Sequence, residues 1–343
     1  MRRYLAAVQR EVAVLAGAPW SSSVEIRTIF LGGGTPSLLE PEDLAALLER
    51  VRARLAVAAD AEVTVECNPE SVSRDKLAAY RAAGVNRISL GVQSLDDAVL
   101  ARLGRLHDGR GARAAFQAAR EAGCDNVSVD LMYGLPDQDP AVWRQNVQGV
   151  LAWRPEHLSA YGLTLDAGSL WAVTGVPGLP VEEAVVEQYW TLARATAAEG
   201  FEHYEISNYA RPGFRSRHNQ VYWRAAEYLA LGPGACGFVG DVRYGNVKPV
   251  SRYCATVEAG ALPIDTAERL TPRQRLGEKL MLGLRLADGV PRAWLDARIA
   301  GDAALARRVE TWGRAGVMVE RGEQVALSEG GFLVSDAVFA ELL

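Results

Sequence analysis

Five places in the first half of the chain carry glycine or polar side chains directly after an apolar run. They are the run Gly32-Gly33-Gly34-Thr35 and the single residues Glu66, Gln93, Asp130 and Thr164. Consecutive glycines let a ligand approach bare backbone, because no Cβ atom stands in the way. Carboxylates, a carboxamide and hydroxyls supply acceptors and donors for a ligand with charged ends and hydroxyl groups. The residue types therefore suit the binding of a small polar ligand.

The glycine run fits neither of the common phosphate-binding loops. The pattern GxGxxG would need glycine or alanine at position 37, where this chain has serine, and the pattern GxxxxGKS/T would need a lysine. Pro36 fixes the exit of the turn and ends the hydrogen bonding of the preceding strand. Taken alone, this run is most simply a structural turn after a strand.

The elements that position these groups alternate between strand and helix. Apolar, β-branched runs predict five strands, at 23–31, 61–70, 85–94, 126–136 and 157–165. Amphipathic segments between them predict helices, several of which end at a glycine. This alternation predicts a parallel sheet, and such sheets bind ligands at the carboxyl ends of their strands. The five groups are therefore expected to form one site, although turn chemistry explains any single one of them.

The chain is expected to form three segments. Residues 1–180 carry the βα units, and residues 181–260 carry a long helix and the motifs EISN and HNxxYW. Residues 261–343 predict helices and a hairpin that turns at Arg321-Gly322, which is typical of a small winged-helix-like α+β domain. This last segment has 11 Lys and Arg against 12 Asp and Glu, so the basic surface of a DNA-binding domain is missing. A packing or partner role is favoured instead.

Composition favours a cytoplasmic protein without nucleic-acid or membrane partners. The 343 residues are 49% hydrophobic and 23% charged, and the net charge is −5. No apolar run reaches the length of a transmembrane helix, and the opening stretch has the spacing of an amphipathic helix rather than of a signal peptide. The four cysteines lie far apart, with neither metal-site spacing nor the context of a disulfide framework.

The motifs at the strand ends together resemble those of the radical S-adenosylmethionine (SAM) proteins. The resemblance is to the oxygen-independent coproporphyrinogen III oxidase group, and within it best to the haem chaperone HemW branch. The motifs that carry it are GGGTPS (32–37), ECNPE (66–70), NRISLGVQS (86–94), LGRLH (103–107), DLMYGLP (130–136), EHLSAYGLT (156–164), EISNYA (205–210) and HNQVYW (218–223). Their order and spacing match over nearly the whole chain, and the form HNxxYW favours the chaperone branch over the oxidase.

The resemblance implies both a fold and a function. The implied fold is a partial (β/α)6 barrel of the three-quarter TIM-like kind, here lacking its first strand, so that the glycine strand is an exposed edge. The implied function is that of a haem chaperone, which binds haem and passes it to an acceptor protein on a SAM-binding scaffold. The alternatives are an oxygen-independent coproporphyrinogen III oxidase, which would be an enzyme, and a truncated inactive form.

The resemblance also implies SAM contacts at the residues that match the family motifs. They are Gly34, Thr35, Glu66, Gln93, Arg105, Asp130 and Thr164. Gly34 and Thr35 would meet the amino and carboxylate ends of the methionine part, Glu66 a ribose hydroxyl, and Arg105 a carboxylate. Asp130 is costly to bury without a ligand or an arginine partner. The alternative for each is a structural role, such as a turn hydroxyl for Thr35 or a surface ion pair for Arg105.

One departure from the family pattern concerns its 4Fe–4S cluster. The cluster-binding CxxxCxxC lies on the loop after the family's first strand, ahead of the helix that here begins near Arg3, and this sequence does not contain it. The four cysteines are not expected to replace it, because three thiolates must converge on one cluster. We expect a gene start that was set too late, against the alternatives of a fragment or of a family member that has lost the site. For haem, His218 is the candidate ligand, against the alternative of an ordinary hydrogen-bonded histidine.

Overall fold

The computed structural model describes residues 1–343, apart from the side chain of Trp20. The chain divides into two compact units, neither of which is one continuous stretch. The sheet unit consists of Phe30–Pro41 and Glu62–Ser216, and the terminal unit consists of Met1–Ile29, Glu42–Ala61 and Arg217–Leu343. The three predicted segments remain a prediction, since these units combine stretches from distant parts of the chain.

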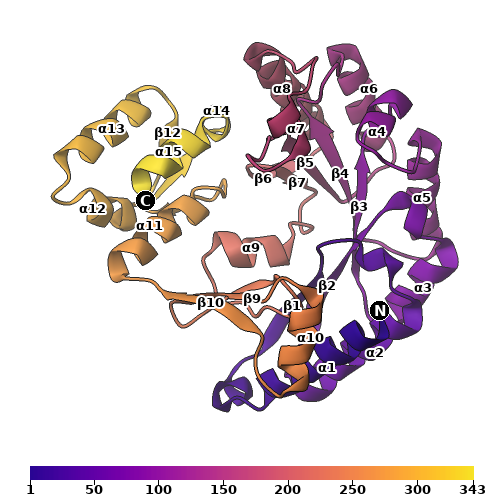
Figure 1. The fold of residues 1–343 in the computed structure, drawn as a ribbon. Coiled ribbons are helices and arrows are strands. Elements are labelled where there is room, and N and C mark those ends of the chain that lie inside the picture. Colours follow the sequence, from indigo (N-terminus) through magenta and orange to yellow (C-terminus); the bar gives the residue numbers. More distant parts are fainter. The chain divides into compact units, whose positions relative to one another are not determined.

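A seven-stranded sheet runs in the order β1-β2-β3-β4-β5-β7-β6 (Figure 1). Its strands are β1 (Ile26–Leu31), β2 (Val57–Cys67), β3 (Arg87–Gln93), β4 (Val127–Tyr133), β5 (His157–Gly162), β6 (Glu202–Glu205) and β7 (Asn208–Ala210). The pairs β2–β3, β3–β4 and β4–β5 are parallel, whereas β7 pairs antiparallel with β5 and β6. This confirms the predicted α/β class and the partial barrel, with β1 at the edge of the sheet.

The longer helices of the sheet unit bury apolar side chains, whereas α7 (Leu170–Thr174) buries none. The helices of this unit are α3 (Arg74–Ala82), α4 (Asp97–Arg102), α5 (Gly109–Glu121), α6 (Pro140–Leu151), α7 and α8 (Glu182–Ala198), with the short helices η2 (Pro36–Leu38) and η3 (Pro69–Ser71). In α5, Ala112, Phe116 and Ala119 are buried, at the spacing of one helix face. Figure 1 shows α3, α5 and α6 along one face of β3 and β4.

The terminal unit packs the N-terminal helices against a later part of the chain. Its elements before residue 270 are α1 (Arg2–Ala16), η1 (Pro19–Ser23), α2 (Pro41–Arg54), α9 (Arg217–Trp223), β8 (Cys236–Val239), β9 (Val242–Asn246), α10 (Val250–Glu258) and β10 (Ile264–Arg269). Val12 of α1 packs with Val51 of α2, and Val8 packs with Tyr253 and Val257 of α10. The apolar face that the sequence predicts for α1 is therefore a core face.

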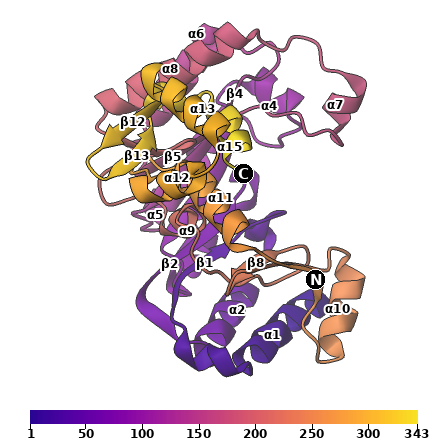
Figure 2. The ribbon, with the colours of Figure 1, turned by 90° about the vertical axis from the view of Figure 1, so that its left-hand side faces the viewer.

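The C-terminal part of the terminal unit is a small α+β assembly, as predicted. It consists of α11 (Pro272–Gly283), β11 (Val290–Pro291), α12 (Arg292–Ile299), α13 (Ala303–Arg314), β12 (Met318–Arg321), β13 (Gln324–Leu327), α14 (Glu329–Phe332) and α15 (Ser335–Leu342). Strands β12 and β13 form the predicted hairpin. Figures 1 and 2 show α12, α13 and α15 around this hairpin.

Two features differ from the sequence-based expectation. The run EHYEISNYA (202–210) has a strand-like sequence throughout but folds as the hairpin β6–β7, with Ile206 and Ser207 at its turn. The three-stranded sheet β10-β9-β8 was not predicted, because β10 is exposed at every residue and gives no alternating pattern. Of the helices that the structure describes, none is long and apolar enough to cross a membrane.

Candidate functional site

The glycine turn after β1 is held by the carboxylate at the end of β2. The Gly33 amide donates a hydrogen bond of 3.0 Å to Glu66 Oε2. Gly33 and Gly34 have φ angles of +77° and +62°, which glycine adopts without the strain of other residues. A Cβ atom added to either would have no heavy atom within 4 Å, so the backbone of the turn is open to a ligand.

Asn68 joins two of the predicted contacts. Its Nδ2 donates to Thr35 Oγ1 at 3.5 Å, and its Oδ1 accepts from Arg105 Nη1 at 3.4 Å. The backbone amide of Asn68 donates to Ser37 Oγ at 3.1 Å. This bond fixes the residues after the glycine turn to the end of β2. Asn68 was not among the predicted contacts, although its place two residues after Glu66 at a strand end is the signal that could have found it.

Gln93 ends β3 in a backbone conformation that is rare for its residue type. Its φ angle is +67°, and the register between β3 and β4 shifts between Leu90 and Gln93. A Cβ atom on Gly91 would lie 3.2 Å from Gln93 Nε2 and 3.6 Å from Asn68 Oδ1, so both amide side chains border the same place. Such backbone strain concentrates at functional sites.

Asp130 lies on β4 among serine hydroxyls. Ser89 Oγ donates to it at 3.1 and 3.2 Å, and Ser128 Oγ donates at 3.3 Å, while Ser159 also bonds its carboxylate. Burial raises the pKa of Asp130, and the three hydroxyls and the positive charge of Arg87 oppose this rise. The charge of Arg87 thus acts on Asp130, while the hydrogen bonds to its carboxylate come from serine hydroxyls.

The negative charge of Asp130 acts on the second carboxylate of the site, Glu66. Burial raises the pKa of Glu66, the hydrogen bond from the Gly33 amide lowers it, and the negative charge of Asp130 raises it further. Two acidic groups in one half-buried place suit a ligand that brings hydroxyl or amino hydrogens.

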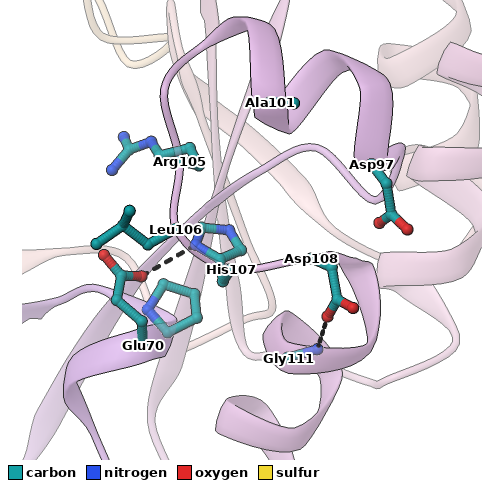
Figure 3. A pocket seen from close by; sticks show the side chains of 9 residues that line it. Glu70, Asp97, Ala101, Arg105, Leu106, His107, Asp108 and Gly111 are labelled. Atoms are coloured by element: carbon teal, nitrogen blue, oxygen red, sulfur yellow. Dashed lines mark hydrogen bonds and ion pairs between the residues drawn. The ribbon is translucent and has the colours of Figure 1, made fainter.

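Arg105 lines a cavity of about 530 Å³ between η3, α4 and α5 (Figure 3). His107 lies beside it, with Nδ1 3.0 Å from Glu70 Oε2 and Nε2 3.1 Å from the carbonyl oxygen of Val92. The loop that carries Arg105 is therefore fixed to the ECNPE motif at two points, through Asn68 and through Glu70.

Two predicted residues do not join this group. Thr164 is exposed on the segment that follows β5, and in the described part of the chain no hydrogen bond links it to the others. His218 belongs to the terminal unit, where Nδ1 lies 2.8 Å from Thr28 Oγ1 and Nε2 lies 2.7 Å from the Tyr222 hydroxyl. Both of its ring nitrogens thus have protein partners.

The cysteines do not form a ligand set for a cluster. Cys67, Cys124 and Cys254 are buried singly, and Cys236 is exposed. Within the described residues, no three His, Cys, Asp or Glu side chains lie together in a way that could hold a metal ion. The residues present therefore fit a polar organic ligand at the strand ends and do not fit a 4Fe–4S cluster.

Comparisons with known proteins identify the relatives of this chain. The model of the radical SAM superfamily matches residues 20–145. The heme chaperone HemW of Mycobacterium tuberculosis (strain H37Rv) is 36% identical over 347 residues, which cover 99% of this chain and 86% of that protein. The chain belongs to the HemW family. The HemW proteins of Bacillus subtilis and Escherichia coli are 36% and 43% identical, over 78% and 63% of this chain and 72% and 57% of their own lengths.

A solved structure shares the HemW-family fold. The coproporphyrinogen III oxidase HemN of Escherichia coli, a radical SAM enzyme, superposes with a TM-score of 0.83 at 22% identity. The match covers 99% of this chain and 82% of that one. The family resemblance and the fold class inferred from the strand-end motifs are therefore confirmed.

Proposed function

We propose that this chain is a haem chaperone, which binds haem and transfers it to an acceptor protein, on a scaffold whose strand ends bind SAM. The observation that carries the SAM part is the joining of the glycine turn, Glu66, Asn68 and Arg105 by hydrogen bonds at one edge of the sheet. The haem part is supported by membership in a family whose relatives are named heme chaperone HemW.

The residues of the site have separate tasks in holding SAM. The open backbone of Gly34 and the hydroxyl of Thr35 suit the amino and carboxylate ends of methionine, and the guanidinium of Arg105 suits the carboxylate. Glu66 and Asp130 would accept from hydroxyl or amino groups of the nucleoside. Gln93, held at the strained end of β3, can donate and accept. Bound SAM would supply a reactive sulfonium centre, and these side chains would orient it.

Thr164 and His218 are proposed contacts that lie outside the hydrogen-bonded group around Asn68. Thr164 would contact the ligand only from the exposed segment after β5. His218 would ligate haem iron through a neutral ring nitrogen, and this requires exchange of its hydrogen bond to Thr28 or Tyr222. The family implies a 4Fe–4S cluster, but because the cysteines here do not fit one, no chemical step is assigned to it.

A haem titration tests the proposed function. We expect a shifted Soret band that saturates at stoichiometric haem, and loss of this band on mixing with a haem-free acceptor protein. His218→Ala should weaken binding and alter the band, whereas His203→Ala, at a histidine stacked on Tyr209, serves as the matched control. No Soret shift at stoichiometric haem would refute the chaperone function, and anaerobic conversion of coproporphyrinogen III would establish the oxidase alternative instead.

A further inference from the structure

A continuous line of hydrogen bonds crosses β6, β5 and β4 inside the sheet unit and ends at Asp130. The Tyr204 hydroxyl lies 2.8 Å from His157 Nε2, and His157 Nδ1 lies 2.8 Å from Ser128 Oγ. Ser128 Oγ in turn lies 3.3 Å from Asp130 Oδ1. Tyr204, His157 and Ser128 are all 0% exposed, so water does not compete for these bonds.

The partners at the two ends fix the direction of donation. At one end, the amide of Ser216 can only donate, and it donates to the Tyr204 oxygen at 3.3 Å. The Tyr204 proton then goes to His157 Nε2, and His157 Nδ1–H donates to Ser128. The Ser128 proton goes to the Asp130 carboxylate.

The opposite direction fails at Tyr204. If His157 carried its proton on Nε2, the Tyr204 oxygen would receive two donors, and its own proton would have no acceptor in the described part of the chain. A buried hydroxyl proton without an acceptor is costly. The geometry thus selects one tautomer of His157.

The electrostatics of the sheet interior agree with this assignment. Burial and the positive charge of Arg87 hold the pKa of His157 well below its ordinary value, which keeps the ring neutral. A neutral imidazole ring has a single N–H group, and in this assignment that group donates to Ser128 Oγ. Hydrogen bonds that donate in one direction polarise each other. This line ends on a carboxylate, which in its ionised form accepts hydrogen bonds and donates none.

We propose that His157 and Tyr204 are positioning residues, which hold Asp130 as an oriented acceptor for the nucleoside part of a bound SAM molecule. This inference rests on the proposed function, since it takes Asp130 as a SAM contact. His157 and Tyr204 lie in the runs EHLSAYG and EHYEIS. Packing alone does not require polar side chains at these two positions, and the positioning role explains them.

The tautomer of His157 is tested without any ligand. Nitrogen-15 spectra of the full chain report which ring nitrogen carries the proton, and a His157→Gln variant assigns its signals among the four histidines. We expect a neutral ring protonated at Nδ1 throughout the neutral pH range. A ring protonated at Nε2, or at both nitrogens, would overturn the directed line.

The positioning role is tested by calorimetric titration with SAM. Tyr204→Phe should weaken SAM binding about threefold to tenfold, the value of one hydrogen bond, and should have no further effect in an Asp130→Asn background. Tyr253→Phe is the matched control, because it removes another buried tyrosine hydroxyl, which donates to the Glu11 carboxylate in the terminal unit. It should leave SAM affinity unchanged.

The outcomes distinguish a failure of the positioning role from a failure of the proposed SAM binding. Equal losses for Tyr204→Phe with and without Asp130 would show that Tyr204 acts through general stability, and would refute the positioning role. Failure of the unmodified chain to bind SAM would refute the SAM part of the proposed function and the positioning role with it. The nitrogen-15 spectra would still decide the hydrogen-bond line.

Discussion

At the scale of single residues, Asn68 is the most connected group of the candidate site. Asn68→Ala removes its bonds to Thr35 and Arg105 and leaves both side chains free to move. We expect SAM binding to weaken by about 1–3 kcal/mol, which is about fivefold to 150-fold, from the loss of two hydrogen bonds. Asn86→Ala is the matched control, since Asn86 Oδ1 bonds the Val63 amide where β3 begins. Equal effects on SAM affinity from both variants in calorimetry would contradict the role of Asn68.

Residue types at strand ends predict which side chains lie near the site, but they do not predict which of these side chains contact each other. Glu66 was predictable because a carboxylate after an apolar strand must face either solvent or a partner. Asn68 was not, because its task depends on the approach of Arg105 from a loop 37 positions later in the chain. Thr164 shows the opposite failure: its place in the chain resembles that of the others, yet the segment after β5 carries it to the surface.

At the scale of elements, the glycine turn after β1 tests how far backbone conformation controls the site. Gly34→Val places a β-branched residue at a φ of +62°, which costs about 1–3 kcal/mol of stability and shifts the turn. Gly301→Val imposes the same strain at a φ of +80° in the terminal unit. Urea unfolding should show similar destabilisation of both variants, and calorimetry should show loss of SAM binding only for Gly34→Val. If Gly34→Val bound SAM as tightly as the unmodified chain, the glycine turn would not be part of the SAM site.

Elements whose sequences have a strong periodic pattern were predictable. Elements that depend on pairing with a distant strand were not. Strands β1 to β5 and their helices follow from buried runs with glycine or capping signals at their ends. The hairpin β6–β7 turns at Ile206 and Ser207, and because neither is a glycine or an asparagine, the sequence gives no signal of a tight turn there. Its antiparallel pairing with β5 is a tertiary contact.

At the scale of the whole molecule, the compact units join stretches that are far apart in the chain, and sequence gives no direct signal of this. In the terminal unit, the buried carboxylate of Glu11 on α1 links the loop at Gly232 with β9 and α10. It accepts from the Gly232 amide at 2.8 Å, from Asn246 Nδ2 at 2.8 Å and from the Tyr253 hydroxyl at 2.6 Å. The partners lie more than 200 residues away, so the sequence shows only a glutamate on an amphipathic helix.

Glu11 is therefore expected to matter more for stability than its surface neighbours. Glu11→Ala leaves three buried donors without an acceptor and should lower the free energy of unfolding by about 3 kcal/mol or more, at roughly 1–3 kcal/mol for each group. Arg3→Ala is the control, because the ion pair between Arg3 and Glu258 joins the same helices α1 and α10 at the exposed surface. Its loss should change stability little. Urea unfolding of both variants measures the difference.

The same variant gives a pH dependence with a definite sign. Burial raises the pKa of Glu11, and the bonds from Tyr253, Gly232 and Asn246 only partly oppose this. Between the unfolded pKa of about 4.3 and the raised folded value, the folded chain holds a proton that the unfolded chain releases. The contribution of Glu11 to stability is therefore complete below that window and falls as the pH rises through the folded pKa. The stability gap between the unmodified chain and Glu11→Ala should narrow with rising pH, and a gap that widens across this window would contradict the assignment.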